Sequence, residues 1–116
     1  MATKAAVITK LDHGLKVVWS DIDGGDVGEW VECADYPDKT IHISGTFTTA
    51  VMQGSNEAAG ANPFTLTGVT QGTPAGGPIN AVGGWAVVEN PLMIRPSATT
   101  ATNAVVTMIC KGRPAR

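Results

Sequence analysis

Three aspartates share one glycine-containing stretch of the chain and could bind a cation. Asp21, Asp23 and Asp26 lie in the run DIDGGD, where their carboxylate oxygens are of the kind that Ca²⁺ takes as ligands. The spacing departs from that of an EF-hand loop, which also has a Glu at its end. Adjacent Asp and Gly residues are equally typical of tight turns. We therefore expect an acidic turn and no metal site, with ion binding as the alternative.

The two histidines are the next candidates for chemistry. His13 and His42 are far apart in the sequence. His42 alternates with Ile41 and Ile43 and so should point away from a core. Catalysis would need a nucleophile and an orienting acid beside His42, and the sequence has no GxSxG elbow. A carboxylate pair for glycoside cleavage is a further possibility, although solvated strand positions also account for the scattered glutamates Glu29, Glu32, Glu57 and Glu89. The glycine-rich stretches lack the Lys and Ser/Thr of a phosphate-binding loop. The sequence thus predicts neither an enzyme nor a cofactor.

The cysteines and tryptophans each allow two interpretations. Cys33 and Cys110 are far apart and lack CxxC spacing, so we expect no zinc site but buried free thiols, with one long-range disulfide as the alternative. An aromatic face packs well against a sugar ring, and Trp19, Trp30 and Trp85 could form such a platform. Tryptophan also anchors β-sandwich cores. Carbohydrate binding is therefore the alternative function.

Charge and hydropathy exclude several partners. The chain has 116 residues, a formal net charge of −2, and only 16% charged residues. This balance gives no general attraction to nucleic acid or anionic lipid, and no apolar run is long enough to span a bilayer. No apolar stretch of signal-peptide length precedes Lys10, so we expect assembly in a cytoplasm. A surface so poor in charge is easiest to explain if part of it lies against other subunits.

Short β-patterned runs, separated by Gly, Pro, Asp and Asn turns, must position these residues. Residues 39–54 are predicted to be two central strands that meet at a Gly-Thr-Phe-Thr corner, with Ile41, Ile43 and Phe47 inward. Residues 68–84 hold six glycines and two prolines, which predicts a long surface loop. Pro96 is predicted to end a strand. Further strands are expected at 15–19, 29–34, 63–67, 85–88, 92–95 and 104–110.

Seven or eight short strands without a helix predict an all-β fold, a single antiparallel β-sandwich of jelly-roll-like type. An immunoglobulin-like sandwich is the alternative, but no Tyr stands two residues before Cys110, as it would in that fold. We expect one domain over residues 1–116, with a possible N-terminal arm at 1–12 and a basic tail at 111–116.

Two runs, TIHISGTFTTAVMQGSNEAAGANPFTLT and NPLMIRPSATTATNAVVTMICKGRP, resemble small β-sandwich proteins of tailed bacteriophages. The resemblance rests on the Ser-Gly-Thr-Phe corner, the Gly-Ser-Asn turn at residues 54–56 and the Ile-Arg-Pro stop at 94–96. Residues 57–60 depart from the pattern, because the usual Asp-Gly and aromatic are missing. Such proteins are similar to capsid decoration, or cement, proteins.

The resemblance implies a structural virion protein on the capsid outer surface, which bridges major capsid subunits and forms a homo-oligomer, a dimer or trimer. The alternatives are a carbohydrate-binding adhesin and a tail-tip or neck component. We expect partner contacts in the N-terminal arm, in the 68–84 loop and in the tail, and no contact with nucleic acid or membrane. The candidate contact residues are Val7, Ile8, Pro74, Pro78, Ile79, Trp85, Arg113 and Arg116.

Overall fold

The computed structural model describes residues 2–70 and 73–112, apart from the side chains of Thr73 and Pro74. In these residues the regular secondary structure is strand, apart from one short 3-10 turn, η1 (Ala58–Gly60). The strands are β1 (Thr3–Lys4), β2 (Ala6–Leu11), β3 (Gly14–Ile22), β4 (Val27–Gly28), β5 (Val31–Glu32), β6 (Asp38–Ser55), β7 (Phe64–Thr65), β8 (Thr67–Thr70), β9 (Thr73–Pro78), β10 (Gly83–Val87) and β11 (Met93–Lys111).

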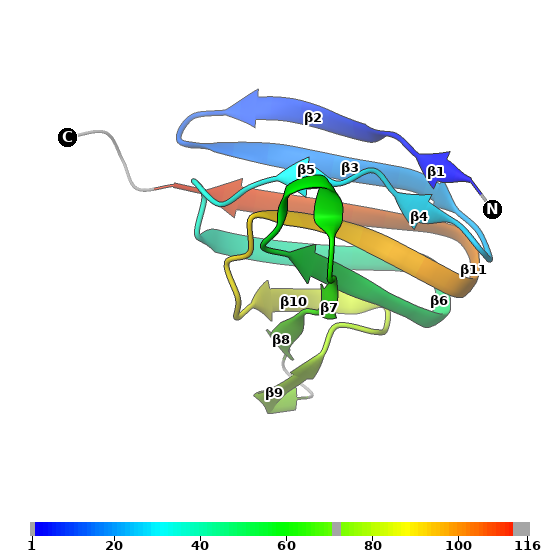
Figure 1. Cartoon of the computed structure of the whole chain (residues 1–116). Helices are drawn as coiled ribbons and strands as arrows, with labels where there is room; N and C mark the ends of the chain where they lie inside the picture. The colour runs from blue at the N-terminus through cyan, green and yellow to red at the C-terminus, as the bar shows by residue number, and fades with distance from the viewer. Residues whose placement is uncertain (1, 71–72, 113–116) are drawn as a thin grey trace.

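Two long antiparallel strands, β6 and β11, organise the molecule. They pair along almost their whole length, from Met93 opposite Ser55 to Lys111 opposite Asp38. Both bend midway, at the right-hand side of Figure 1, where the register shifts between Ala98 and Val105. Each strand therefore contributes one half to each of two facing layers.

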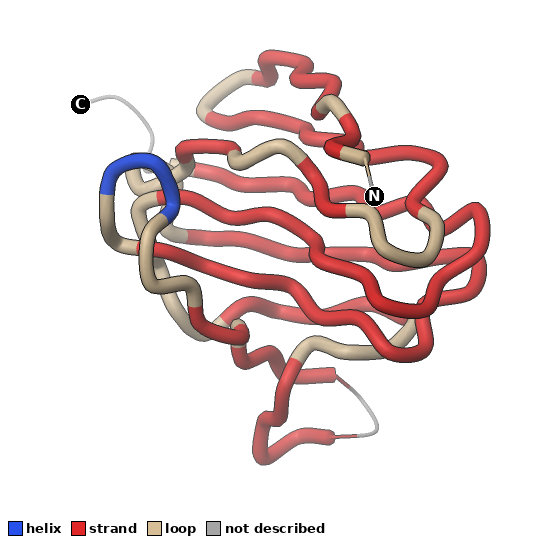
Figure 2. Tube along the Cα trace, turned by 45° about the vertical axis from the view of Figure 1, so that its right-hand side comes forward, coloured by secondary structure: helices blue, strands red, loops and turns tan. Residues whose placement is uncertain are grey.

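The larger layer has the order β2, β3, β11, β6, β10, β8 and β9, with the second half of β11 and the first half of β6 at its centre. The smaller layer contains the other halves of β6 and β11, flanked by β4 and β5 on one side and β7 on the other. Figure 2 shows the paired strands continuing around the bend from one layer into the other. The fold is a jelly-roll-like β-sandwich, as predicted, and its one exception to antiparallel pairing described here is β1 with β4.

The core lies between the layers and follows the predicted alternation. Ile41, Ile43 and Phe47 are buried, whereas His42 and Ser44 are exposed. Other core residues on β3, β6 and β11 include Val17, Trp19, Met52, Ile94, Val106 and Met108, each 0% exposed. The period of two read from the sequence thus identified the buried face correctly.

The predicted corner at residues 45–48 does not interrupt the chain's pairing. β6 runs without a break from Asp38 to Ser55, because Thr46 and Phe47 pair with Thr102 and Ala101 of β11. Gly45 has a φ of +85°, which turns the strand without ending it. The two predicted strands are therefore two halves of one bent strand.

The prediction of a long loop at residues 68–84 is wrong. This segment contains most of β8, all of β9 and the start of β10. β8 and β9 form a hairpin at the edge of the larger layer, where a proline's missing N–H removes no bond from a central ladder.

The prediction that Pro96 ends a strand is also wrong. It lies in β11 between Ile94, which pairs with β5, and Ser97, which pairs with β4. The missing N–H of Pro96 falls in this gap, and its ring packs against Gly28, where a Cβ would lie 2.5 Å from the proline Cδ. The strand therefore continues through the proline to Lys111.

Other predicted boundaries shift by a few residues. The strand expected at 29–34 is reduced to β5, and the one at 63–67 is divided between β7 and β8. The N-terminal segment is an integral part of the larger layer, since β2 pairs with β3 from Ala6 to Leu11. Over residues 2–70 and 73–112, no helix has the length and apolar character needed to cross a membrane.

Candidate functional site

The outer face of the larger layer is the candidate functional site, and cross-strand register assembles it. One row of directly opposed residues crosses five strands: Val7, Val18, Thr107, His42 and Gly84. The next row runs through Thr9, Lys16, Ile109, Thr40, Ala86 and Val69. Among the residues of these two described rows, Lys16 alone is an Asp, Glu, Lys or Arg. We call this surface, defined by the two rows, the outer face.

The outer face is hollowed where β8 approaches β10 and β6. The hollow has a volume of about 580 Å³ and is open to solvent. Its described lining consists of Thr40, Ile41, His42, Val69, Thr70, Gly84, Trp85, Ala86, Thr107 and Ile109. None of these lining residues is Asp, Glu, Lys or Arg. The hollow offers methyl groups, threonine hydroxyls and one imidazole, which suits a partner of low charge.

His42 lies at the middle of the outer face, directly opposite Thr107 on one side and Gly84 on the other. Neither neighbour is an acid, and the hollow's described lining contains no carboxylate and no thiol. Across the residues that the structure describes, no three His, Cys, Asp or Glu side chains gather where they could hold a metal ion. The arrangement leaves the His42 imidazole exposed in the hollow and gives no positive indication of catalysis.

The predicted contact residues are distributed over three places. Val7 belongs to the outer face, and Ile8 follows it on β2, with exposed fractions of 64% and 51%. Trp85 lines the hollow although it is largely buried. Pro78 is exposed on β9, whereas Ile79 is fully buried and presents no surface to a partner. The side chain of Pro74 and residues Arg113 and Arg116 lie outside the described part of the chain.

The tryptophans do not form the sugar-stacking platform considered above. Trp19 is 0% exposed, and its indole N–H donates to the carbonyl oxygen of Glu29 at 2.9 Å. Trp85 is also buried, and its N–H donates to the Ala81 carbonyl oxygen at 3.1 Å. Trp30 is half-buried, with the Arg95 guanidinium 4.4 Å above its ring. Two of the three rings are therefore core anchors.

Two residues of the aspartate stretch, Asp23 and Asp26, accept hydrogen bonds from backbone N–H groups. Asp26 accepts hydrogen bonds from the backbone N–H groups of Asp23 (2.9 Å) and Ala2 (3.1 Å) and lies 3.7 Å from the Lys4 ammonium. The hydrogen bond from Asp23 N–H is the main cause of a lowered Asp26 pKa, with Ala2 and Lys4 adding to it against a raising effect of burial. Asp23 in turn accepts from the N–H of Asn103 at 2.9 Å. These carboxylates hold the acidic turn and the bend of β11 together.

Lys39 is a buried lysine that sequence reasoning missed. Lys39 is 1% exposed and directly opposite Cys110 across β6 and β11. Its ammonium donates to the Asn90 side-chain oxygen, and Asn90 donates to the carbonyl oxygen of Ala34 at 3.0 Å. Burial lowers the pKa of Lys39. The available signal was its place in the inward series with Ile41 and Ile43.

Both cysteines are free and buried, as predicted. Lys39 is close enough to act electrostatically on both thiols. Burial raises the pKa of Cys33 to about 12 and also raises the pKa of Cys110. The thiols therefore stay protonated at neutral pH and behave as small apolar side chains.

The outer face was missed because its residues come from separate segments. His42 was assigned to the solvent side, but the predicted contacts were placed in loops and termini. The signal was the lack of charge at the outward positions of residues 40–44 and 105–109, namely Thr40, His42, Ser44, Val105, Thr107 and Ile109.

Fold and site together define a small jelly-roll-like β-sandwich with one charge-poor, hollowed sheet face. No protein-family model matches the sequence, and no curated protein is significantly similar to it. Among solved structures, the SPBc2 prophage-derived protein YomS is similar to this chain with a TM-score of 0.63 and 17% identity, over 90% of this chain and 97% of YomS. A cupin domain from Bordetella pertussis is similar with a TM-score of 0.53 and 10% identity, over 97% of this chain and 99% of that one. At these identities the likeness concerns the fold.

Proposed function

We propose that this protein is a non-enzymatic structural protein of a tailed-phage virion, which decorates the outer capsid surface and stabilises the shell by bridging major capsid subunits. The observation that carries the proposal is the outer face, an exposed sheet surface with a hollow of about 580 Å³ and no acid, lysine or arginine among its described lining residues. A surface of this kind stabilises an assembly through the area it buries.

Two further points support a phage setting. The chain resembles phage decoration proteins in its Ser-Gly-Thr-Phe, Gly-Ser-Asn and Ile-Arg-Pro segments. A protein described as prophage-derived shares the fold over nearly its whole length. Stabilisation would come from about 25 cal/mol per Å² of apolar area buried at each of many equivalent sites, so that a weak single contact becomes effective over the whole shell.

Co-sedimentation with capsids of the phage that encodes this chain tests the proposal. The wild-type protein is expected to sediment with intact shells and to raise the temperature at which they release DNA. His42→Glu and Thr107→Glu place a charge at the middle of the outer face and are expected to weaken binding at least tenfold. Thr65→Glu, on exposed β7 of the smaller layer, is the matched control and should bind normally.

Two results would contradict the proposal. Wild-type protein that stays in the supernatant with intact capsids would remove the shell as its partner, and sedimentation with purified tails instead would favour the tail-tip or neck alternative. Equal capsid binding by the wild type and both glutamate variants would remove the outer face as the docking surface.

A further inference from the structure

The edge strand β2 is open along one side. Over residues 2–70 and 73–112, β3 is the one strand that pairs with β2, which forms the top edge of the larger layer in Figure 1. β2 carries three exposed aliphatic side chains, Val7 (64%), Ile8 (51%) and Leu11 (37%). Natural sheet edges are usually protected by proline, by charge or by a covering segment. Lys10 is the single charged residue on this apolar edge strand.

The register of the β2–β3 hairpin shows which backbone groups face the open side. The two-residue turn Asp12-His13 makes Leu11 and Gly14 a hydrogen-bonded pair, and the pattern alternates from there. Ala6, Ile8 and Lys10 therefore direct their N–H and C=O groups away from β3. The N–H of Ala6 confirms this direction, because it donates to the Glu29 carboxylate at 3.1 Å. The N–H groups of Ile8 and Lys10 are left for another strand.

We propose that β2 pairs antiparallel with β2 of a second copy of this chain about a twofold axis at Ile8, which joins the two larger layers into one continuous sheet. In this register Ile8 faces Ile8 of the second copy and the two exchange both backbone hydrogen bonds. Each Lys10 N–H donates to the Ala6 carbonyl oxygen of the other copy. Lys10 and the other copy's Ala6 form the next hydrogen-bonded pair, so the exposed Glu29 carboxylate that now accepts from Ala6 N–H gives way to the carbonyl oxygen of the other copy's Lys10.

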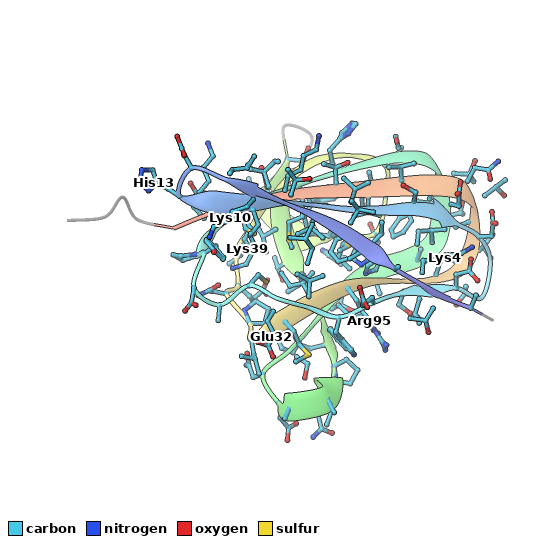
Figure 3. All side chains as sticks on the ribbon, turned by 90° about the horizontal axis from the view of Figure 1, so that it is seen from above. Lys4, Lys10, His13, Glu32, Lys39 and Arg95 are labelled. Atoms are coloured by element: carbon cyan, nitrogen blue, oxygen red, sulfur yellow. The ribbon has the colours of Figure 1, made fainter. Side chains whose placement is uncertain are left out.

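Charge favours this register over its neighbour. With the axis at Ile8, each Lys10 lies opposite Ala6 of the other copy, so the two ammonium groups are offset by roughly 13 Å along the strands. With the axis at Thr9, the offset falls to roughly 7 Å, and two like charges approach each other. The Ile8 register also brings Asp12 of each copy to the level of Lys4 of the other. Figure 3, viewed toward the open edge, shows Lys4 and Lys10 toward opposite ends of β2.

The twofold axis is perpendicular to the sheet, because directly opposed residues of an antiparallel pair point to the same face. Both outer faces consequently point to the same side of the dimer. Pairing between two short strands buries less area than a standard stable interface, so the dimer is expected to dissociate on dilution. This self-association does not rest on the proposed function, since it is measured in the absence of capsids.

Sedimentation velocity of the full chain over a range of concentrations tests the pairing. The wild type is expected to shift from monomer to dimer as its concentration rises. Ile8→Pro removes an N–H that does not bond to β3, so it should remain folded by circular dichroism and stay monomeric. Ile8→Lys places two ammonium groups at the axis and should weaken dimerisation at least tenfold. Val88→Lys, at an exposed aliphatic residue outside β2 (61%), should not.

A cysteine at the axis tests the register directly, even if Ile8→Pro fails to fold. A hydrogen-bonded antiparallel pair has Cα atoms about 5.5 Å apart, which is within disulfide range. Ile8→Cys is expected to give a disulfide-linked dimer on mild oxidation, and Val88→Cys is not, while Cys33 and Cys110 are buried. A wild type that remains monomeric at high concentration, dimerisation unchanged in Ile8→Lys, or a dimer that Ile8→Cys does not crosslink would each overturn the proposal.

Discussion

Gly45 and Asn103 face each other where β6 and β11 bend together. Both have positive φ, +85° for Gly45 and +46° for Asn103. A Cβ on Gly45 would lie 2.6 Å from the carbonyl oxygen of Asn103 and 2.9 Å from the Cα of Ala104. The two long strands can cross from one layer to the other only because a glycine and an asparagine accept this backbone conformation side by side.

Gly45→Ala is therefore expected to destabilise the protein. The new methyl group meets backbone atoms that cannot move aside, and the positive φ adds strain, so the free energy of unfolding should fall by at least about 2 kcal/mol. Urea unfolding measures this change. Gly84→Ala is the matched control, because a Cβ there meets nothing within 4 Å, and it should change stability by about 0.5 kcal/mol or less. Equal effects of the two substitutions would contradict the role of the bend.

Asp26 is expected to make the protein sensitive to acid. Its pKa in the folded chain is lowered from 3.8, chiefly by the hydrogen bond from Asp23 N–H, so the unfolded chain binds the proton more tightly. Its contribution to stability is then complete above pH 3.8 and is lost as the pH falls through the lower, folded value. Asp26→Asn should be less stable than the wild type at pH 7, and the difference should shrink in acid.

Urea unfolding at a series of pH values measures the effect of Asp26. Asp35→Asn, at an exposed position in the turn before β6, serves as the control for the loss of one negative charge. A stability difference between the wild type and Asp26→Asn that stays constant down to strongly acidic pH would count against this explanation.

The local sequence was sufficient for the buried face but not for the bend or the outer face. Ile41 and Ile43 alternate with polar residues, and that period is visible within a few positions. The continuity of β6 through Phe47 depends on Ala101, more than fifty residues later in the chain. The outer face depends on register across six strands, which no single segment specifies. Non-local pairing, rather than local propensity, decided each of these features.

Cys33 is expected to make the protein lose stability in alkali. Burial raises its pKa in the folded chain from 9.0 to about 12, so the unfolded chain releases the thiol proton first as the pH rises. The free energy of unfolding should therefore fall between pH 9 and pH 12, by up to about 1.4 kcal/mol per pH unit from this group. Cys33→Ala should show a shallower decline over the same range in guanidinium unfolding. Parallel pH profiles for the two proteins would show that Cys33 is not the cause.

The hydrogen bond between buried Lys39 and exposed Asn90 predicts that two substitutions act in opposite ways. Asn90→Ala leaves the Lys39 ammonium, 1% exposed, without its side-chain acceptor, and should lower the free energy of unfolding by about 1–3 kcal/mol. Lys39→Met removes the charge and keeps an unbranched apolar chain, while the exposed Asn90 can turn to water, so it should be neutral or stabilising. In the double variant the effect of Asn90→Ala should shrink to the loss of its bond to Ala34. A double-mutant cycle by urea unfolding measures the coupling, and additive effects of the two substitutions would show that the pair does not act as a unit.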